Sequence, residues 1–567
     1  MRRKHVLSLL MLSMGIALLI AATTVGVASS ATQKAGHAGA LRGGVLKVAH
    51  SGGGFDTLDP QIAYVANDWA ALYATQRLLL NFPNKVGKAG SVLQPDAAAA
   101  MPTISKSGKV YTFHLRKGMR FSDGSPVTAA AFQRAFERDL SPKMYVQNGC
   151  FLAIDQMIVG GTKFANCAGT KGVKTSNHIS GISAKGLTLT FHLTKPNPTF
   201  LSILGMQWFG AVKPNMKYSN NPNGVLTYPS AGPYYIATNS PQRLAVFKRN
   251  KYYKGFQEAN PNQIVINENN GSGEAQVLQI EKGQIDTDFG QVPSDQVASV
   301  SQKYGGPNKS QFHVGPTTCV SWASLNTGRA PTDSAAVRKA LSYAFSRTSV
   351  IRLGGPYSGT PADQFLVPGI PGYKKLHIYP NFPDFPKAKA VGGSALHGTL
   401  NLYYRPSSTF QSNLVQFEQR QFGQLGFQTK LQTSDPTGYY HPLQTKSIAL
   451  GSDGYNVAGG GWCADYLDGF DYMNVNLDGN TIGDTGNVNY FYFNSSKFNA
   501  GLAHAAAQFG AKRAAAYQAL DKELMTKYVP FIPYEVSNNR FLSSSRVKNW
   551  IYSSYFNYPI LQALSVG

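Results

Sequence analysis

Motifs for catalysis and for zinc binding are missing from this sequence of 567 residues. We find no nucleophile elbow, no H-E-x-x-H motif and no S-x-x-K motif, the patterns of common hydrolases and metalloproteases. No CxxC or Cys/His spacing suggests a zinc site. The glycine-rich segment 51–54 lacks the Gly-Lys-Ser/Thr ending of a phosphate-binding loop. We therefore expect neither an enzyme nor a bound metal or cofactor.

Acidic residues are scarce: the chain has 29 Asp and Glu against 53 Lys and Arg, a formal net charge of +24. Such a charge favours nucleic acid, anionic lipid or anionic envelope polymers as partners. We expect no nucleic acid, because zinc-finger spacing, RNP-like runs and basic helices are all lacking. The alternative is a solubility trait, or an adaptation to an acidic habitat or a charged wall. A charged fraction of 14% argues against a coiled coil, and 43% hydrophobic residues predict an ordered globular protein.

Long apolar runs are absent beyond the first 30 residues. Arg2, Arg3 and Lys4 precede an apolar stretch of about 17 residues at 6–22, and small residues follow at 27–31. This pattern is typical of a signal peptide over residues 1–30, with an uncleaved N-terminal anchor as the alternative. No cysteine stands at the cleavage region, so we expect no lipid-anchored N-terminus. The sequence predicts an exported protein that is periplasmic, extracellular or associated with the cell wall.

The four cysteines are Cys150, Cys167, Cys319 and Cys463. An even number in an exported chain suggests disulfide bonds, with three possible connectivities. The short separation of Cys150 and Cys167 favours a local loop staple between them. That pairing would leave Cys319 for Cys463.

Length and hydrophobic patterning together predict several lobes of mixed structure. A chain this long exceeds what one core can organise, so two or three lobes are expected. Alternation predicts strands at 45–49, 110–115, 119–121 and 187–193. Helical periodicity marks 68–80, a segment from Thr128 to about Arg138, 333–345 and 517–528. The class is therefore α/β or α+β.

Several motifs along the chain point to one family. Residues 111–118 read YTFHLRKG, residues 121–129 read FSDGSPVTA, and residues 461–466 read GWCADY. Leu58-Asp59-Pro60 follows the first predicted strand, and residues 283–286 read GQID. With these motifs the chain, beyond the predicted signal peptide, resembles family 5 bacterial solute-binding proteins, the dipeptide- and oligopeptide-binding proteins.

The resemblance implies an α/β fold of the type II (class C) periplasmic-binding-protein-like kind, with two large lobes, a hinge and an extra small lobe. Matching the motif positions places a discontinuous lobe I at 31–82, 213–318 and 536–567. Lobe II would be 83–212, a small inserted lobe, and lobe III would be 319–535. The ligand would lie between lobes I and III and be enclosed when they close.

The resemblance also implies a function. The protein would be the extracytoplasmic substrate-binding component of an ABC transporter, a monomer that captures peptides and delivers them to membrane permease subunits. The same fold could bind another solute, such as an oligosaccharide, a metal chelate or a wall fragment. A wall-associated adhesin that uses the +24 charge is the other alternative. In the oligopeptide-binding form the resemblance pairs Cys319 with Cys463.

The resemblance points to Asp465 first among the candidate ligand-binding residues, because the family's aspartate at this position receives the ligand's α-ammonium group. A buried cation must be paired, and a carboxylate held by the backbone of a cleft can do this. Trp462 would wall a side-chain pocket or pack in the core. Arg405 loosely resembles the arginine that meets a dipeptide's carboxylate, a task that suits a guanidinium fork. An exposed arginine is the alternative.

Two tyrosines and one departure complete the expected site. Tyr64 and Tyr534 lie near the lobe boundaries, where family members present aromatic side chains to the cleft. Oligopeptide binders carry an arginine six residues before the aspartate, and this chain has Gly459 there. A site without that cation would accept uncharged or differently shaped ligands.

Overall fold

The computed structural model describes residues 42–567, except 52–53, 168, 171–174, 269–270 and 435–437. The expected signal peptide lies outside the described residues. Within the described ranges, no helix has the length and apolar character needed to cross a membrane.

A five-stranded sheet is built around β1, the strand expected at 45–49. β1 runs parallel to both of its neighbours, and the remaining pairs are antiparallel. Leu46 and Val48 are fully buried, so the alternating pattern marks the core face. In spatial order the strands are β11 (Thr287–Asp288), β1 (Val45–Ala49), β10 (Gln263–Asn267), β9 (Leu244–Arg249) and β8 (Tyr234–Ser240).

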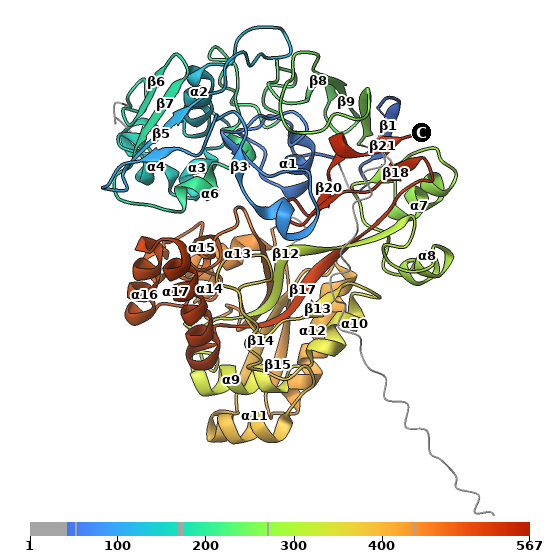
Figure 1. Ribbon diagram of the computed structural model, residues 1–567. Helices are drawn as coiled ribbons and strands as arrows, with labels where there is room; N and C mark the ends of the chain where they lie inside the picture. The colour runs from blue at the N-terminus through green and yellow to red at the C-terminus, as the bar shows by residue number, and fades with distance from the viewer. Residues whose placement is uncertain (1–41, 52–53, 168, 171–174, 269–270, 435–437) are drawn as a thin grey trace, which may run out of the picture. The chain divides into compact units, whose positions relative to one another are not determined.

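A four-stranded antiparallel sheet lies in the segment between residues 103 and 192 (Figure 1). In spatial order its strands are β4 (Thr103–Ile104), β5 (Val110–His114), β7 (Thr188–His192) and β6 (Ile182–Lys185). Helix α2 (Ala129–Asp139) packs against one face of this sheet. It confirms the helix expected to begin after Thr128. The prediction of a strand at 119–121 is wrong. Phe121 donates its N–H to Ser125 O, so the chain folds back in a turn and leaves one isolated bridge at Arg120.

A six-stranded mixed sheet carries most of the C-terminal half. In spatial order its strands are β13 (Gly359–Pro361), β17 (Phe531–Leu542), β12 (Phe312–Leu325), β16 (Val457–Cys463), β14 (Thr399–Tyr404) and β15 (Gln428–Thr433). Helix α9 (Ala335–Ala344) confirms the helix expected at 333–345, and the Ser334 hydroxyl caps it by accepting the Val337 N–H. The fully buried side chains of Val337 and Leu341 join the apolar core of this sheet.

Strands β12 and β17 are the longest in the structure and pair with each other in two stretches (Figure 1). Phe312–Pro316 pairs with Asn538–Leu542, and Val320–Ser324 pairs with Phe531–Val536. The register shifts between Pro316 and Val320. Such an irregularity interrupts the ladder of backbone hydrogen bonds and bends the strands.

One predicted helix is much shorter than its pattern. Helical periodicity covers 68–80, but α1 spans only Ala66–Leu72. The chain then turns and enters β2 (Leu80–Asn81), which pairs with β3 (Gln94–Pro95). Leu78, Leu79 and Leu80 are buried as extended chain, so tertiary packing overrides the local helical pattern here.

The remaining α-helices connect and cover these sheets. The expected helix at 517–528 is α17, which continues as a π-helical turn over Leu524–Tyr528. The other helices are α3 (Asn148–Phe151), α4 (Ile154–Met157), α5 (Gly161–Ala165), α6 (Phe200–Ile203), α7 (Gly273–Glu281), α8 (Val297–Lys303), α10 (Arg347–Leu353), α11 (Phe385–Gly392), α12 (Thr409–Gly423), α13 (Tyr440–Gln444), α14 (Lys446–Ala449), α15 (Gly469–Leu477), α16 (Ser496–Ala507) and α17 (Gly510–Glu523).

Candidate ligand-binding site

Asp465 follows the end of strand β16, and a disulfide bond holds that end in place. Cys463, the last residue of β16, is bonded to Cys319, which lies directly opposite it on the antiparallel strand β12. The second disulfide joins Cys150 to Cys167. These are the pairings named from the sequence. The covalent link fixes the strand two residues before the carboxylate that we expect to meet a ligand.

Three groups contact Asp465, two of them from distant parts of the chain. The Tyr64 hydroxyl donates to Asp465 Oδ2 at 3.0 Å, although the two residues are 401 positions apart. The Asp465 backbone N–H donates to Asp471 Oδ2 at 3.0 Å. The Tyr555 hydroxyl donates to the Asp465 backbone oxygen at 2.8 Å. Asp465 is only 9% exposed, so these contacts position a buried carboxylate.

Asp465 differs from the two aspartates that follow it. Asp468 forms a buried ion pair with Arg513 at 2.8 Å. Asp471 accepts hydrogen bonds from the Trp462 indole N–H and from the Asp465 backbone. Within the described ranges, no ion pair joins Asp465 to a lysine or arginine. A buried carboxylate without a cation is unfavourable unless it is protonated or a ligand supplies the charge.

The ionisation of this aspartate pair reflects its burial. Loss of solvent raises the pKa of Asp465 to about 7, while the hydrogen bond from Tyr64 lowers it. Burial, and then the nearby Asp465 carboxylate, raise the pKa of Asp471 well above its usual range. Burial therefore biases both carboxyl groups toward the neutral form. A cation placed beside Asp465 would favour the ionised form.

Aromatic rings surround Tyr64, the residue that donates to the Asp465 carboxylate. The Tyr64 ring lies 6.0 Å from Trp69, 5.7 Å from Phe151 and 5.7 Å from Trp208, measured between centroids. Trp462 is half-buried and directs its indole N–H toward Asp471. The structure thus brings Tyr64, Trp462 and Asp465 together, as the sequence analysis expected of a single site.

The glycine run before Asp465 lies where one side of β16 loses its strand partner. β14 pairs with β16 only at Val457 and Ala458, so in the part of the chain that the structure describes no strand follows beside 459–463 on that side. A Cβ at Gly460 would lie 2.6 Å from the Trp322 indole nitrogen, so packing requires glycine there. Gly459 and Gly460 are half-buried and Gly461 is exposed. Backbone groups of this strand can therefore be reached by an extended ligand.

The structure places Arg405 and Tyr534 apart from these contacts. Arg405 follows β14, and its guanidinium carbon lies 4.9 Å from the centre of the Tyr439 ring and 5.8 Å from that of Tyr440. The Tyr439 hydroxyl donates to Gly459 O at 2.7 Å, which connects Arg405 to the glycine run. Tyr534 is 3% exposed and stacks on Phe345 in the core of the six-stranded sheet.

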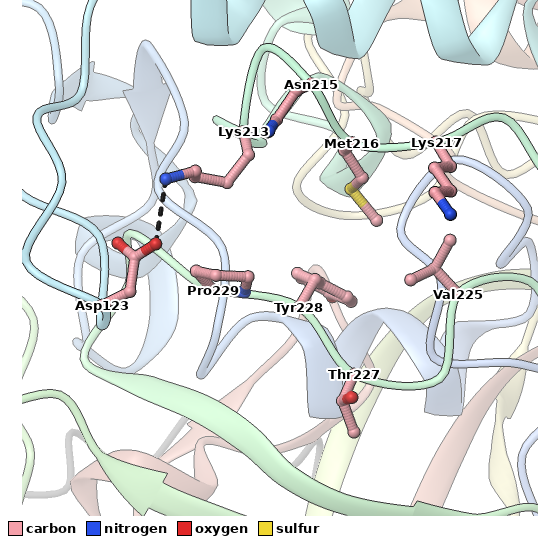
Figure 2. Close-up of a pocket in the computed structure, with 9 residues that line it drawn as sticks. All are labelled: Asp123, Lys213, Asn215, Met216, Lys217, Val225, Thr227, Tyr228 and Pro229. Carbon is pink, nitrogen blue, oxygen red and sulfur yellow. Dashed lines mark hydrogen bonds and ion pairs between the residues drawn. The ribbon is translucent and has the colours of Figure 1, made fainter.

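A cavity elsewhere in the chain shares none of these residues (Figure 2). It has a volume of about 420 Å³ and is lined by Asp123 and by residues from two stretches of the chain, 213–217 and 225–229. Figure 2 shows the Lys213 ammonium paired with Asp123, at 2.9 Å. Met216 and Tyr228 supply apolar surface to its wall. This cavity is separate from the Asp465 site.

A match to a protein-family model identifies the family of this chain. Residues 92–484 match the model of the bacterial extracellular solute-binding proteins, family 5, middle region. The chain belongs to this family. Its members bind solutes outside the cytoplasm, which agrees with the expected class of binding protein and with the expected family.

Several named relatives extend the match. The periplasmic oligopeptide-binding protein OppA of Escherichia coli is 24% identical over 490 residues, 81% of each chain. The probable D,D-dipeptide-binding periplasmic protein DdpA of the same organism is 25% identical over 453 residues, 77% of this chain and 78% of its own. The match to the oligopeptide-binding protein OppA of Bacillus subtilis, at 25% identity, spans only half of that relative's length.

Solved structures show the same fold. The clavulanic acid biosynthesis oligopeptide binding protein 2 superposes with a TM-score of 0.82 at 19% identity, covering 93% of this chain and 96% of its own. The periplasmic binding protein DppA of Helicobacter pylori, solved with the peptide STSA, gives a TM-score of 0.69 at 20% identity, over 92% and 98% of the two chains. The α/β fold is therefore that of the periplasmic binding proteins.

Two contacts of Asp465 escaped the sequence analysis. Tyr555 lies 90 residues away along the chain, in a segment without a recognisable motif. Asp471 carried a weak signal, since it is the third aspartate within seven residues of a largely apolar stretch. Carboxylates at such density in a buried segment must share donors or protons.

Proposed function

We propose that this protein captures a peptide through its α-ammonium group, which pairs with Asp465, and delivers it to the permease of an ABC importer. The observation that carries the proposal is a buried carboxylate whose one side-chain hydrogen bond comes from Tyr64 and which lacks a cation in the described chain. A peptide ammonium supplies that charge and further donors. Relatives named as oligopeptide- and dipeptide-binding proteins support the same ligand class.

The uncovered side of β16 supports an extended peptide as the ligand. A chain laid along 460–463, beyond the Gly459 oxygen that Tyr439 occupies, can exchange backbone hydrogen bonds with the strand, and its side chains then alternate between the two sides. With the ammonium group at Asp465, the peptide would run antiparallel to β16 toward Gly459. Tyr439 binds Gly459 O and stacks under Arg405. Arg405 would then lie on the side of the ligand's carboxylate, for which its guanidinium fork is suited.

The lobes expected from the sequence give this site a closing motion. Under this proposal lobe I comprises 31–82, 213–318 and 536–567, lobe II 83–212 and lobe III 319–535. The register shift between Pro316 and Val320 lies at the expected boundary between lobes I and III, where an interrupted ladder can bend. Tyr64, from lobe I, and Asp465, from lobe III, would then meet across the cleft.

Thermal unfolding in the presence of short peptides tests the function. A peptide that binds only the folded state should raise the unfolding temperature with concentration, since the stabilisation grows by about 1.4 kcal/mol for each tenfold rise above Kd. Small-angle scattering should show a smaller radius of gyration at saturating peptide. The proposed ligand class would be wrong if no free-amine peptide stabilised the protein while an oligosaccharide or a nickel chelate did. The solute that stabilises the protein would then be the ligand.

A further inference from the structure

Residues 83–212 carry a surface of almost one sign of charge. Four of the five acidic residues in this segment, Asp96, Glu137, Asp139 and Asp155, are buried. Burial also raises the pKa of Asp96, Asp139 and Asp155, which favours their neutral forms. Asp123 is the exposed acid among the described residues of the segment, and it is paired with Lys213. Exposed cations are Lys85, Lys88, Lys106, Lys109, Arg116, Lys117, Arg120, Lys143, Lys163, Lys185 and Lys195.

One face of the four-stranded sheet in this segment is open and lined by hydroxyl groups. Tyr111, Phe113, Leu189 and Phe191 are fully buried on the face that α2 covers. The alternate residues therefore point to the other side. There the register aligns one row across all four strands, formed by Thr103, Thr112, Thr190 and Ser183. All four residues are half-buried or exposed, and the Thr112 and Thr190 hydroxyls lie 3.5 Å apart.

Exposed cations lie at both ends of the strands, on either side of this hydroxyl row. At one end, the Lys109 backbone oxygen accepts the Leu193 backbone N–H, which brings this residue beside the chain that leads to Lys195. At the other end, Arg116 and Lys117 follow β5, and Lys185 ends β6. The seven steps along the chain from Lys109 to Arg116 span about 23 Å in extended conformation, at about 3.3 Å per residue. Two groups of cations at this separation match repeated anionic groups better than they match one small anion.

We propose that this open sheet face, with Lys109, Arg116, Lys117, Lys185 and Lys195 around it, binds a linear anionic polymer of the cell envelope. Charge complementarity supplies the attraction, and the hydroxyl row offers donors to phosphate or carboxylate oxygens. The strand residues on this face are threonine, serine, histidine and lysine, together with the half-buried Val110 at the start of β5. Among these described strand positions there is no large exposed apolar side chain to insert into lipid. The surface is distinct from the Asp465 site, so polymer binding would concentrate the protein in the envelope without occupying the ligand.

The test compares two variants of equal net charge. The patch variant carries Lys109→Gln, Arg116→Gln, Lys117→Gln, Lys185→Gln and Lys195→Gln. The matched control changes five exposed lysines of the C-terminal half to glutamine, namely Lys374, Lys375, Lys387, Lys389 and Lys512. Affinity is measured by biolayer interferometry at several salt concentrations. The probes are lipid-free poly(glycerol phosphate), polygalacturonate, and vesicles of phosphatidylglycerol and phosphatidylcholine.

The patch variant should lose polymer affinity by about tenfold or more at low salt and show a shallower salt dependence, because each ion contact contributes to that slope. The control should stay within about threefold of the wild type, since distant exposed charges are screened. A third variant with the four patch lysines changed to arginine should keep its affinity. The phosphate and carboxylate probes distinguish a teichoic-type polymer from an acidic polysaccharide. Equal losses in both glutamine variants, an unaffected patch variant, absent polymer binding by the wild type, or a preference for vesicles would each overturn the proposal.

Discussion

Replacement of Asp465 by asparagine should abolish most of the affinity for a free-amine peptide while keeping the shape of the site. The carboxylate is 9% exposed, and the described chain offers it no internal cation. In Asp465→Asn a bound ammonium group would be buried without a counter-charge. Removing one partner of a buried pair costs about 3–5 kcal/mol, which corresponds to about two to four decades in Kd. Isothermal titration at pH 7.4, where Asp465 and a peptide amine are both largely ionised, measures this loss directly.

A second ligand separates the ammonium pair from other effects of the mutation. An N-acetylated peptide lacks the cation, so it should bind the wild type weakly and lose little more in Asp465→Asn. Asp453→Asn is the matched control, because the Asp453 side chain is 85% exposed. This substitution should change the free energy of peptide binding by no more than a few tenths of a kcal/mol. If Asp465→Asn bound the free-amine peptide as tightly as the wild type, Asp465 would not be the anchor. The glycine run at 459–461 would then be the place to seek ligand contacts.

The other predictions concern protons and disulfide bonds. Because burial raises the pKa of Asp465 to about 7, peptide binding below that pH should release a proton, and the affinity should fall by up to about tenfold per pH unit. Titrations in two buffers of different ionisation enthalpy count that proton. Without ligand, a raised carboxyl pKa stabilises the fold most below about pH 4 and loses this contribution as the pH rises to about 7, so the difference in unfolding free energy between wild type and Asp465→Asn should decline over that range. Removal of the Cys319–Cys463 bond, which closes 144 residues, should cost about 5 kcal/mol in denaturant unfolding, against about 3 kcal/mol for Cys150–Cys167, which closes 17; equal costs would contradict the chain-entropy explanation.

The hydrophobic pattern of the sequence predicted those strands and helices in which one face is buried and the other is exposed. Val45–Ala49 alternates because one face of β1 is core, and Ala335–Ala344 is amphipathic because one stripe packs on a sheet. The helix expected at 68–80 failed because residues 78–80 are buried as extended chain, through contacts with a strand that begins at Gln94. A helical period in the sequence does not record which distant segment will cover those side chains.

The sequence motif names part of the candidate site, whose role in binding stays a prediction. Trp462 and Asp465 stand within six consecutive motif residues, so the sequence carries them directly. Tyr64 was expected from its position near a lobe boundary, and the structure adds the hydrogen bond that joins it to Asp465. Tyr555 could not be predicted, because its contact depends on how the C-terminal segment returns to the centre of the fold. That none of the described lysines and arginines pairs with Asp465 likewise depends on its neighbours in three dimensions.

Native mass spectrometry with a competing mixture of ligands tests the central claim most directly. The purified protein is incubated with equal amounts of short free-amine peptides, their N-acetylated forms, an oligosaccharide and a nickel chelate, and the masses of the bound species are read. Peptide capture through Asp465 predicts adducts of the free-amine peptides alone, and their loss in Asp465→Asn. Adducts of the acetylated peptides at equal abundance, or of the sugar or the chelate in their place, would contradict it.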